Sequence, residues 1–191
     1  SIAENSGSTI TITATMSAAD GDDVTVAIGT SGTGTEGTDY GTISDITISA
    51  GATTGTATFD PTDDSVYEGN ETAIVAITGV TSSGSASEDG TQSETITITE
   101  DDSAPTVTLS TSASSINENS LSTLTLTATL SNATTEDVTV ALGTSGTGTE
   151  GTDYGTISDI TISAGSTTGT TAFDPTDDSV YEGNETAIVA I

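Results

Sequence analysis

The chain of 191 residues has no lysine, arginine or histidine, although it carries 29 aspartate and glutamate residues. Its formal net charge is -29, and no side chain of its own can neutralise any part of that charge. Without cationic side chains the protein cannot make the counterion-releasing contacts on which phosphate binding depends, so we expect no binding to nucleic acid and no attraction to anionic membranes. Cations are the partners that this charge favours.

The same absences remove most catalytic chemistry. The chain has no histidine or cysteine, which excludes Ser-His and Cys-His nucleophiles and zinc sites built from imidazole or thiolate. The lack of lysine and arginine excludes Schiff bases and arginine phosphate clamps. Paired carboxylates could serve as the acid and base of a glycosidase, but two phenylalanines, four tyrosines and no tryptophan offer little platform for a sugar. We therefore expect the protein not to be an enzyme.

Apolar side chains are also scarce. Hydrophobic residues make up 31% of the chain, so the core must be thin and aliphatic. No apolar run approaches the roughly 18 residues of a membrane span, so we expect no membrane insertion. Because there is no cysteine, stability must come from something other than disulfides.

The chain contains an internal repeat. Residues 29–77 recur as residues 143–191, and only three pairs differ, which are Ala52/Ser166, Ala57/Thr171 and Thr58/Ala172. The first copy has no counterpart of residues 105–114, and the second has none of residues 78–104. A window on a longer tandem array would show both gaps, and this is the interpretation that we favour. The alternative is that neighbouring chains supply the missing strands, as in donor-strand assembly.

Within each copy the apolar residues follow a period of two. Ile10, Ile12 and Ala14 alternate with threonines, and Ile96 and Ile98 flank Thr97. Such alternation predicts half-buried strands, and clusters of turn residues separate the runs. About seven short strands per copy predict an all-β fold of tandem immunoglobulin-like antiparallel β-sandwiches. We place the first unit at residues 1–102, without its first strand, and the second at residues 103–191, without its last.

Acidic residues gather in loops rather than on strands. The densest stretch is residues 60–71, which recurs as residues 174–185. Holding carboxylates within about 5 Å of one another costs on the order of a few kcal/mol per pair, which a divalent cation would offset. Calcium suits such loops best because it accepts six to eight oxygen ligands in flexible geometry. A solvated acidic surface is the alternative interpretation for any single aspartate, but less so for the whole cluster.

The order of these acidic motifs resembles that of the Calx-beta domain. The motifs are Glu4-Asn5 before a strand, Gly37-Thr38-Asp39-Tyr40 in a loop, Asp63-Asp64 followed by Glu68 and Glu71, and Glu100-Asp101-Asp102 at the end of the unit. The resemblance implies a seven-stranded sandwich that binds calcium in a cluster at one end, near the junction with the next domain.

The resemblance also implies a set of calcium ligands. In the first unit these are Glu4, Asp39, Asp63, Asp64, Glu68, Glu71, Asp101 and Asp102. In the second unit they are Glu118, Asp153, Asp177, Asp178, Glu182 and Glu185. The chain departs from the family pattern at Ser65 and Ser179, where a third acidic residue is common.

From these features we expect a calcium-stiffened structural or adhesive module that is repeated to form an extracellular stalk, adhesin or filament. Its partners would be neighbouring identical repeats or chains, joined directly or by strand exchange. A regulatory calcium-sensing module is one alternative. Another is binding to ice or a crystalline surface, because Thr9, Thr11 and Thr13 present regularly spaced hydroxyls on one strand face.

Overall fold

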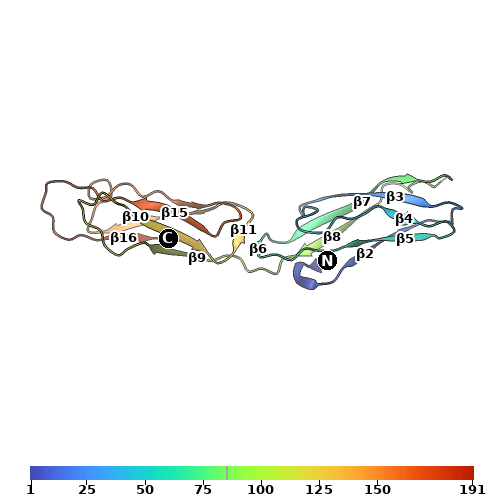
Figure 1. The fold of residues 1–191 in the computed structure, drawn as a ribbon, viewed down its shortest axis with the longest axis horizontal. Coiled ribbons are helices and arrows are strands. Elements are labelled where there is room, and N and C mark those ends of the chain that lie inside the picture. Colours follow the sequence, from blue (N-terminus) through green and yellow to red (C-terminus); the bar gives the residue numbers. More distant parts are fainter. Residues whose placement is uncertain (85) are drawn as a thin grey trace. The chain divides into compact units, whose positions relative to one another are not determined.

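The chain forms two compact units in the computed structural model, which describes residues 1–84 and 86–191 (Figure 1). The first unit comprises Ser1–Asp64 and Glu68–Asp101, and the second comprises Ser65–Tyr67 and Asp102–Ile191. Both consist of strands and loops, which confirms the predicted all-β class. Among the described residues one short 3-10 turn is the only helical element, and no helix has the length and apolar character that a membrane crossing requires.

Seven strands and the 3-10 turn make up the first unit: β1 (Ile2–Ala3), η1 (Glu4–Ser6), β2 (Ile10–Thr15), β3 (Val24–Gly32), β4 (Ile46–Ile48), β5 (Thr54–Phe59), β7 (Glu71–Thr81) and β8 (Ser93–Thr99). The strands of the second unit are β6 (Val66–Tyr67), β9 (Val107–Thr111), β10 (Leu124–Leu130), β11 (Ala133–Thr134), β12 (Val138–Val140), β13 (Gly143–Gly146), β14 (Ile160–Ile162), β15 (Thr168–Phe173) and β16 (Ala187–Ala190).

The first unit is a sandwich of two sheets. One has the strand order β1-β8-β7-β3-β4, and the other is the pair β2-β5. Alternation explains the packing, because Val24 and Val26 of β3 and Ile46 of β4 are buried and contact Ile12 of β2 from the opposite sheet. The threonines between these residues point to the other faces of the sheets.

One pairing differs from the predicted antiparallel pattern. Strand β1 runs parallel to β8, with Ile2 opposite Ile98 and Ala3 opposite Thr99. The first and last strands of the unit therefore end at the same side of the sheet. This pairing places η1, which follows β1 directly, beside the residues that follow β8.

A stacked aromatic pair anchors the core near that end of the sandwich. Tyr40 and Phe59 have ring centroids 4.9 Å apart, and both side chains are fully buried. They pack in one cluster with Val75 of β7 and with Ile96 and Ile98 of β8. Aromatic pairs in this geometry contribute about 0.5–1.5 kcal/mol beyond the apolar area that they bury.

The second unit repeats this arrangement with different edges. Strand β10 pairs with β15 as β2 pairs with β5, and β9 adds a third strand on the other side of β10. Strand β16 corresponds in sequence to part of β7 and pairs with β13. The equivalent aromatic pair, Tyr154 and Phe173, also has centroids 4.9 Å apart.

Gly32 ends β3 in a conformation that only glycine adopts readily. Its φ angle is 125°, and a Cβ atom placed there would lie 2.1 Å from the carbonyl oxygen of Thr72 in β7. The same carbonyl accepts a hydrogen bond from the amide of Gly34 at 3.0 Å. The turn at Gly32 therefore directs the chain from β3 into the loop that carries Asp39.

We predict that Gly32→Ala lowers the free energy of unfolding by about 2–4 kcal/mol, because it combines a forbidden backbone angle with a clash against the main chain. Chemical denaturation in saturating calcium measures the loss. Gly79→Ala is the matched control, because no atom lies within 4 Å of its added Cβ. A loss as small as that of the control would contradict this account of the turn.

Candidate metal centre

The antiparallel topology brings several loops together at one end of the first unit. Strands β3, β5 and β8 end there, and β7 begins there. The loops that leave or enter these strands carry Asp39, Asp64, Glu68 and Asp101, while η1 adds Glu4. Residues up to 97 positions apart in the chain are thus neighbours, as the hydrogen bond from Thr99 to the carbonyl of Ile2 shows.

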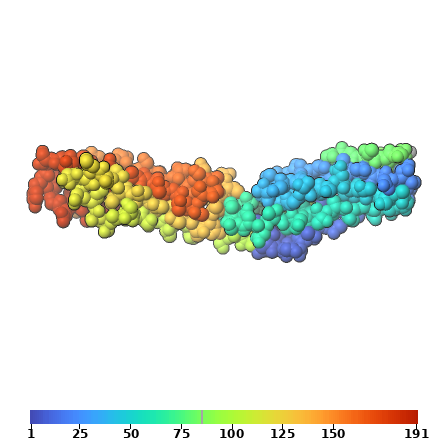
Figure 2. All heavy atoms as spheres, in the orientation of Figure 1, coloured from blue at the N-terminus to red at the C-terminus, as the bar shows by residue number. Residues whose placement is uncertain are grey.

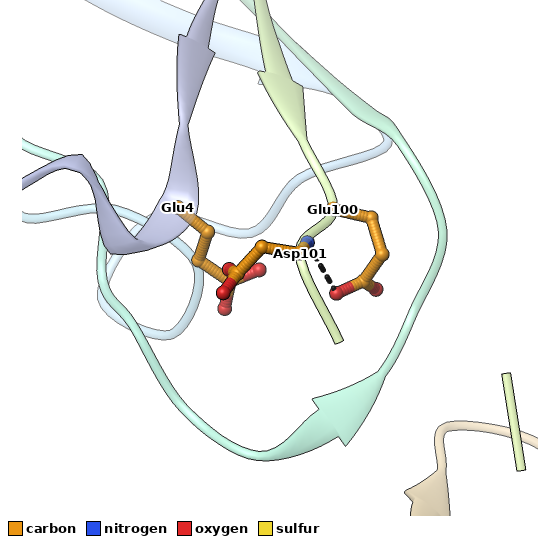
Figure 3. Close-up of side chains that lie close together, drawn as sticks. All are labelled: Glu4, Glu100 and Asp101. Atoms are coloured by element: carbon orange, nitrogen blue, oxygen red, sulfur yellow. Dashed lines mark hydrogen bonds between the residues drawn. The ribbon is translucent and has the colours of Figure 1, made fainter. Parts of the chain in front are cut away.

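Two groups of three carboxylates form at this end. One consists of Glu4, Glu100 and Asp101 (Figure 3), and the other of Asp39, Glu68 and Glu71. Within each group one oxygen per residue lies within 4.8 Å of those of the other two. Among the described residues Glu4 and Asp39 are the only buried charged side chains, each with 8% of its surface exposed.

The loop around Asp39 holds its carboxylate in place. One Asp39 oxygen accepts a hydrogen bond from the amide of Thr35, and the Asp39 amide donates to the carbonyl of Thr35 at 2.9 Å. The Asp39 carbonyl in turn accepts from the amide of Thr62 in the acidic loop. A ligand fixed in this way loses little conformational entropy when it binds a cation.

Glu100 connects the acidic loop to the end of β8. Its Oε2 atom accepts hydrogen bonds from the amides of Glu68 at 2.7 Å and Gly69 at 2.8 Å. Its own amide donates to Oδ1 of Asn70 at 3.0 Å, and its Oε1 accepts from the amide of Asp101 (Figure 3). Glu100 therefore belongs to one carboxylate group and also fixes the loop that carries the other.

Burial and mutual repulsion leave these carboxylates short of positive charge. Loss of hydration raises the pKa of Glu4 to about 7, and the charges of Glu100, Asp64 and Glu68 act in the same direction. Burial, followed by the charge of Asp39 and a hydrogen bond with it, raises the pKa of Glu71 to about 7. The pKa of Glu68 is raised for similar reasons. Without a cation, the fold therefore favours protons on this cluster.

The second unit repeats the cluster in a more open form. Its groups are Glu118, Asp178 and Glu182, and Asp153, Glu182 and Glu185. All of these side chains are exposed except that of Asp153, which is half-buried. Partial loss of hydration and the charge of Asp153 still raise the pKa of both Glu182 and Glu185.

The structure places the ligands implied by the resemblance as follows. Glu4, Asp39, Glu68, Glu71 and Asp101 lie in the two groups of the first unit, and Glu118, Asp153, Asp178, Glu182 and Glu185 lie in those of the second. The amide of Asp64 donates to Glu4, whereas Asp63, Asp102 and Asp177 belong to none of these groups. Asp102 falls in the second unit.

Glu100 is a cluster member that the implied ligand set did not contain. The signal was present, because Ile96 and Ile98 face the core and a period of two places Glu100 on the same face. Its role depends on the amides of Glu68 and Gly69, which are 32 and 31 residues away in the chain. That contact could not be read from the strand pattern.

The donor set fits a hard divalent cation. All of its ligand atoms are carboxylate oxygens, which suit calcium or magnesium rather than a metal that prefers nitrogen or sulfur. Glu4 and Glu100 with Asp101 could hold one ion, and Asp39 with Glu68 and Glu71 a second. Bound calcium would supply the positive charge that the chain lacks.

The comparison with protein families agrees with this chemistry. The model of the Calx-beta domain matches residues 1–103 and again residues 100–191. The chain belongs to the Calx-beta family. Calx-beta domains bind calcium, and the acidic groups of this chain provide the oxygen ligands for it.

Two solved structures are similar to the Calx-beta pair at low identity. The crystal structure of CBD12 from CALX1.2 is 20% identical, with a TM-score of 0.46, and the match covers 91% of this chain and 70% of that one. The crystal structure of the calcium binding domain CBD12 of CALX1.1 is 16% identical, with a TM-score of 0.45, and the match covers 99% and 76%. Among curated proteins no relative matches.

We predict that pH acts in opposite directions on the calcium-free and calcium-bound protein. The pKa of Glu4 and of Glu71 is about 7 in the fold and 4.5 as the reference value, so proton uptake stabilises the calcium-free fold fully below pH 4.5. This stabilisation is lost as the pH rises through 7. Without calcium the melting temperature should therefore rise as the pH falls from 8 to 5. Over the same range the increment that calcium adds should shrink, because protons compete for its ligands.

Differential scanning calorimetry in EDTA and in calcium at each pH measures both effects. A calcium increment independent of pH would show that these carboxylates are not the ligands.

We predict that Glu4→Gln raises the melting temperature of the calcium-free protein at pH 8, because it removes one buried charge from the cluster. The same change should weaken calcium binding in the first unit about tenfold or more, since a charged ligand is lost. Isothermal titration calorimetry separates the affected sites from those of the second unit. Glu94→Gln is the control, because Glu94 is exposed on β8 and belongs to neither group. Equal effects of the two variants would remove Glu4 from the site.

Proposed function

We propose that this protein is a non-catalytic structural or adhesive module, stiffened by calcium and repeated to build a stalk, adhesin or filament outside the cell. The observation that carries the proposal is the duplication of the carboxylate cluster in a chain with no cationic side chain. Each unit presents its acidic groups at equivalent positions, so each requires its own cations. A repeat protein built in this way gains stability unit by unit.

The thin core makes the calcium contribution significant. At a free calcium concentration 100-fold above the dissociation constant, binding to the folded state alone adds about 2.7 kcal/mol per independent site. Small domains have total stabilities of about 5–15 kcal/mol, so this is a large fraction. Relief of repulsion within the cluster is the physical source of the gain.

The position of two ligands supports a stiffening role. Glu100 and Asp101 are the last residues of the first unit, and Asp102 begins the second. Calcium bound by Glu100 and Asp101 would restrain the chain where it leaves β8. We therefore propose that calcium limits bending at the connection between consecutive units.

An extracellular setting fits the same chemistry. Calcium sites of extracellular modules have dissociation constants of about 0.1 to 1 mM, and they stay loaded because calcium outside the cell is plentiful. A dense, single-sign surface charge also keeps a repeat protein soluble. The partners in this proposal are neighbouring identical repeats or chains.

We predict that chelation lowers the melting temperature by about 5 °C or more, since 1 kcal/mol shifts the midpoint of a domain of this size by about 4–8 °C. Calorimetry in 2 mM calcium, 2 mM magnesium and EDTA tests the effect, with magnesium as the control for general screening. Magnesium should stabilise less, because it demands a tighter octahedral geometry than these loops offer. An unchanged melt in EDTA would contradict the proposal.

Stiffening needs a separate measurement. Small-angle scattering should give a narrower distribution of molecular dimensions in calcium than in EDTA, at temperatures where both units stay folded. A variant with Glu100→Gln and Asp101→Asn should lose the difference, whereas Glu94→Gln should keep it. Calcium that stabilises the units without narrowing the distribution would leave a binding module and overturn the stiffening role.

A further inference from the structure

The two units contain nearly the same platform of residues in two different environments. Strand β7 pairs with β3 on one side and with β8 on the other. Its counterpart β16 pairs with β13, and no strand among the described residues pairs with its other edge. Residues 71–77 and 185–191 are identical in sequence, so the chain contains two copies of the edge to which β8 binds and one copy of β8.

Exposure shows what β8 covers. Ala73 is fully buried and Val75 is 4% exposed, whereas their counterparts Ala187 and Val189 are only half-buried. On the other face of β16, Ile188 is 56% exposed. The C-terminal stretch of the chain, red in Figure 2, forms part of the visible surface of this unit. An apolar strand edge left open in this way is a template for pairing with another chain.

The backbone of β16 is oriented for a new strand. The amide of Thr186 donates to Oγ1 of Thr147, and its carbonyl accepts from Thr147 and Gly148, so both groups point toward β13. Successive residues of a strand direct these groups to opposite edges. The amides and carbonyls of Ala187 and Val189 therefore point to the open edge.

A groove beside this edge matches the side chains of β8. It has a volume of about 1050 Å³ and is lined by Leu126, Tyr154, Phe173, Ala187 and Val189 among others. In the first unit Ile96 and Ile98 of β8 pack against the equivalent residues and are 7% and 3% exposed. The groove in the second unit can therefore accept two isoleucine side chains.

The acidic loop provides a second set of contacts. In the first unit Glu100 accepts from the amides of Glu68 and Gly69. The equivalent amides of Glu182 and Gly183 have no acceptor among the described residues, and Tyr181 in the same loop is 97% exposed. A glutamate that follows a bound strand would meet both amides.

We propose that the open edge of β16 binds, in trans, an extended polypeptide segment with the pattern of β8, in which alternating isoleucines are followed by a glutamate. A second β16 strand fits less well, because it would bring alanine and valine to the groove and no glutamate to the loop amides. This donor strand is held by backbone pairing, two apolar side chains and one carboxylate. The inference does not rest on calcium binding, since each of these contacts forms without a metal.

A fluorescent peptide of residues 93–101 tests the proposal with the full 191-residue chain. Fluorescence anisotropy in 150 mM salt, with EDTA and separately with calcium, should show saturable binding of one peptide per chain. A peptide with Glu100→Ala should bind about tenfold more weakly, because two charge-assisted hydrogen bonds are lost. A peptide with both isoleucines changed to threonine should not bind. No binding by the parent peptide in either buffer would overturn the proposal, whereas binding in EDTA alone would support it whatever the outcome for calcium.

The register can be tested because the chain contains no cysteine. In the first unit Ile74 lies opposite Thr95, and the counterpart of Ile74 is Ile188. Ile188→Cys should therefore form a disulfide with a Thr95→Cys peptide at least about tenfold faster than with a Thr97→Cys peptide, which is two residues out of register. Equal rates would mean nonspecific edge pairing and would contradict the proposal. A chain that dimerises through β16 and excludes the peptide, as measured by sedimentation, would also overturn it.

Discussion

Repulsion among carboxylates is the interaction on which the rest of this structure depends. Closing the sandwich brings the loops after β3, β5 and β8 to one end, and these loops carry the acidic residues. Glu4 and Asp39 are buried there in a chain with no lysine, arginine or histidine. The fold has two ways to reduce the repulsion, which are uptake of protons, as the pKa values of about 7 for Glu4 and Glu71 indicate, and binding of a cation. Membership of the Calx-beta family identifies that cation as calcium.

Strand β8 links the core to the metal centre. Ile96 and Ile98 fill the apolar interior, and Glu100, two residues further along the same face, fixes the acidic loop through two backbone amides. The second unit shows the consequence of an edge without such a strand. There the same loop and the same carboxylates are exposed, although the sequence from residue 185 to 191 is identical to that from 71 to 77. Burial of the cluster is therefore a property of the completed sheet and not of the acidic loop itself.

Much of the fold could be predicted from the alternation of apolar and polar residues. Ile10 and Ile12, or Ile96 and Ile98, mark strands because a strand turns successive side chains to opposite faces. The ligands were harder to predict, because loops have no such period. Asp63 and Asp64 are adjacent in sequence, yet only the amide of Asp64 contacts Glu4. Asp101 joins the carboxylates while Asp102, the next residue, falls in the second unit. The parallel pairing of β1 with β8 likewise depends on two segments about 96 residues apart, as the opposition of Ile2 and Ile98 shows.

The sequence by itself determined the all-β class, the tandem repeat, the need for external cations and the loops that supply their ligands. These follow from composition, period and repetition, which are local or statistical properties of the chain. Only the tertiary structure decided which carboxylates lie within 4.8 Å of one another, that Glu100 is among them, and that one edge of β16 is open. The physical reason is that strand pairing joins residues far apart in the chain, and neither hydration loss nor hydrogen bonding at a site exists until those strands have met.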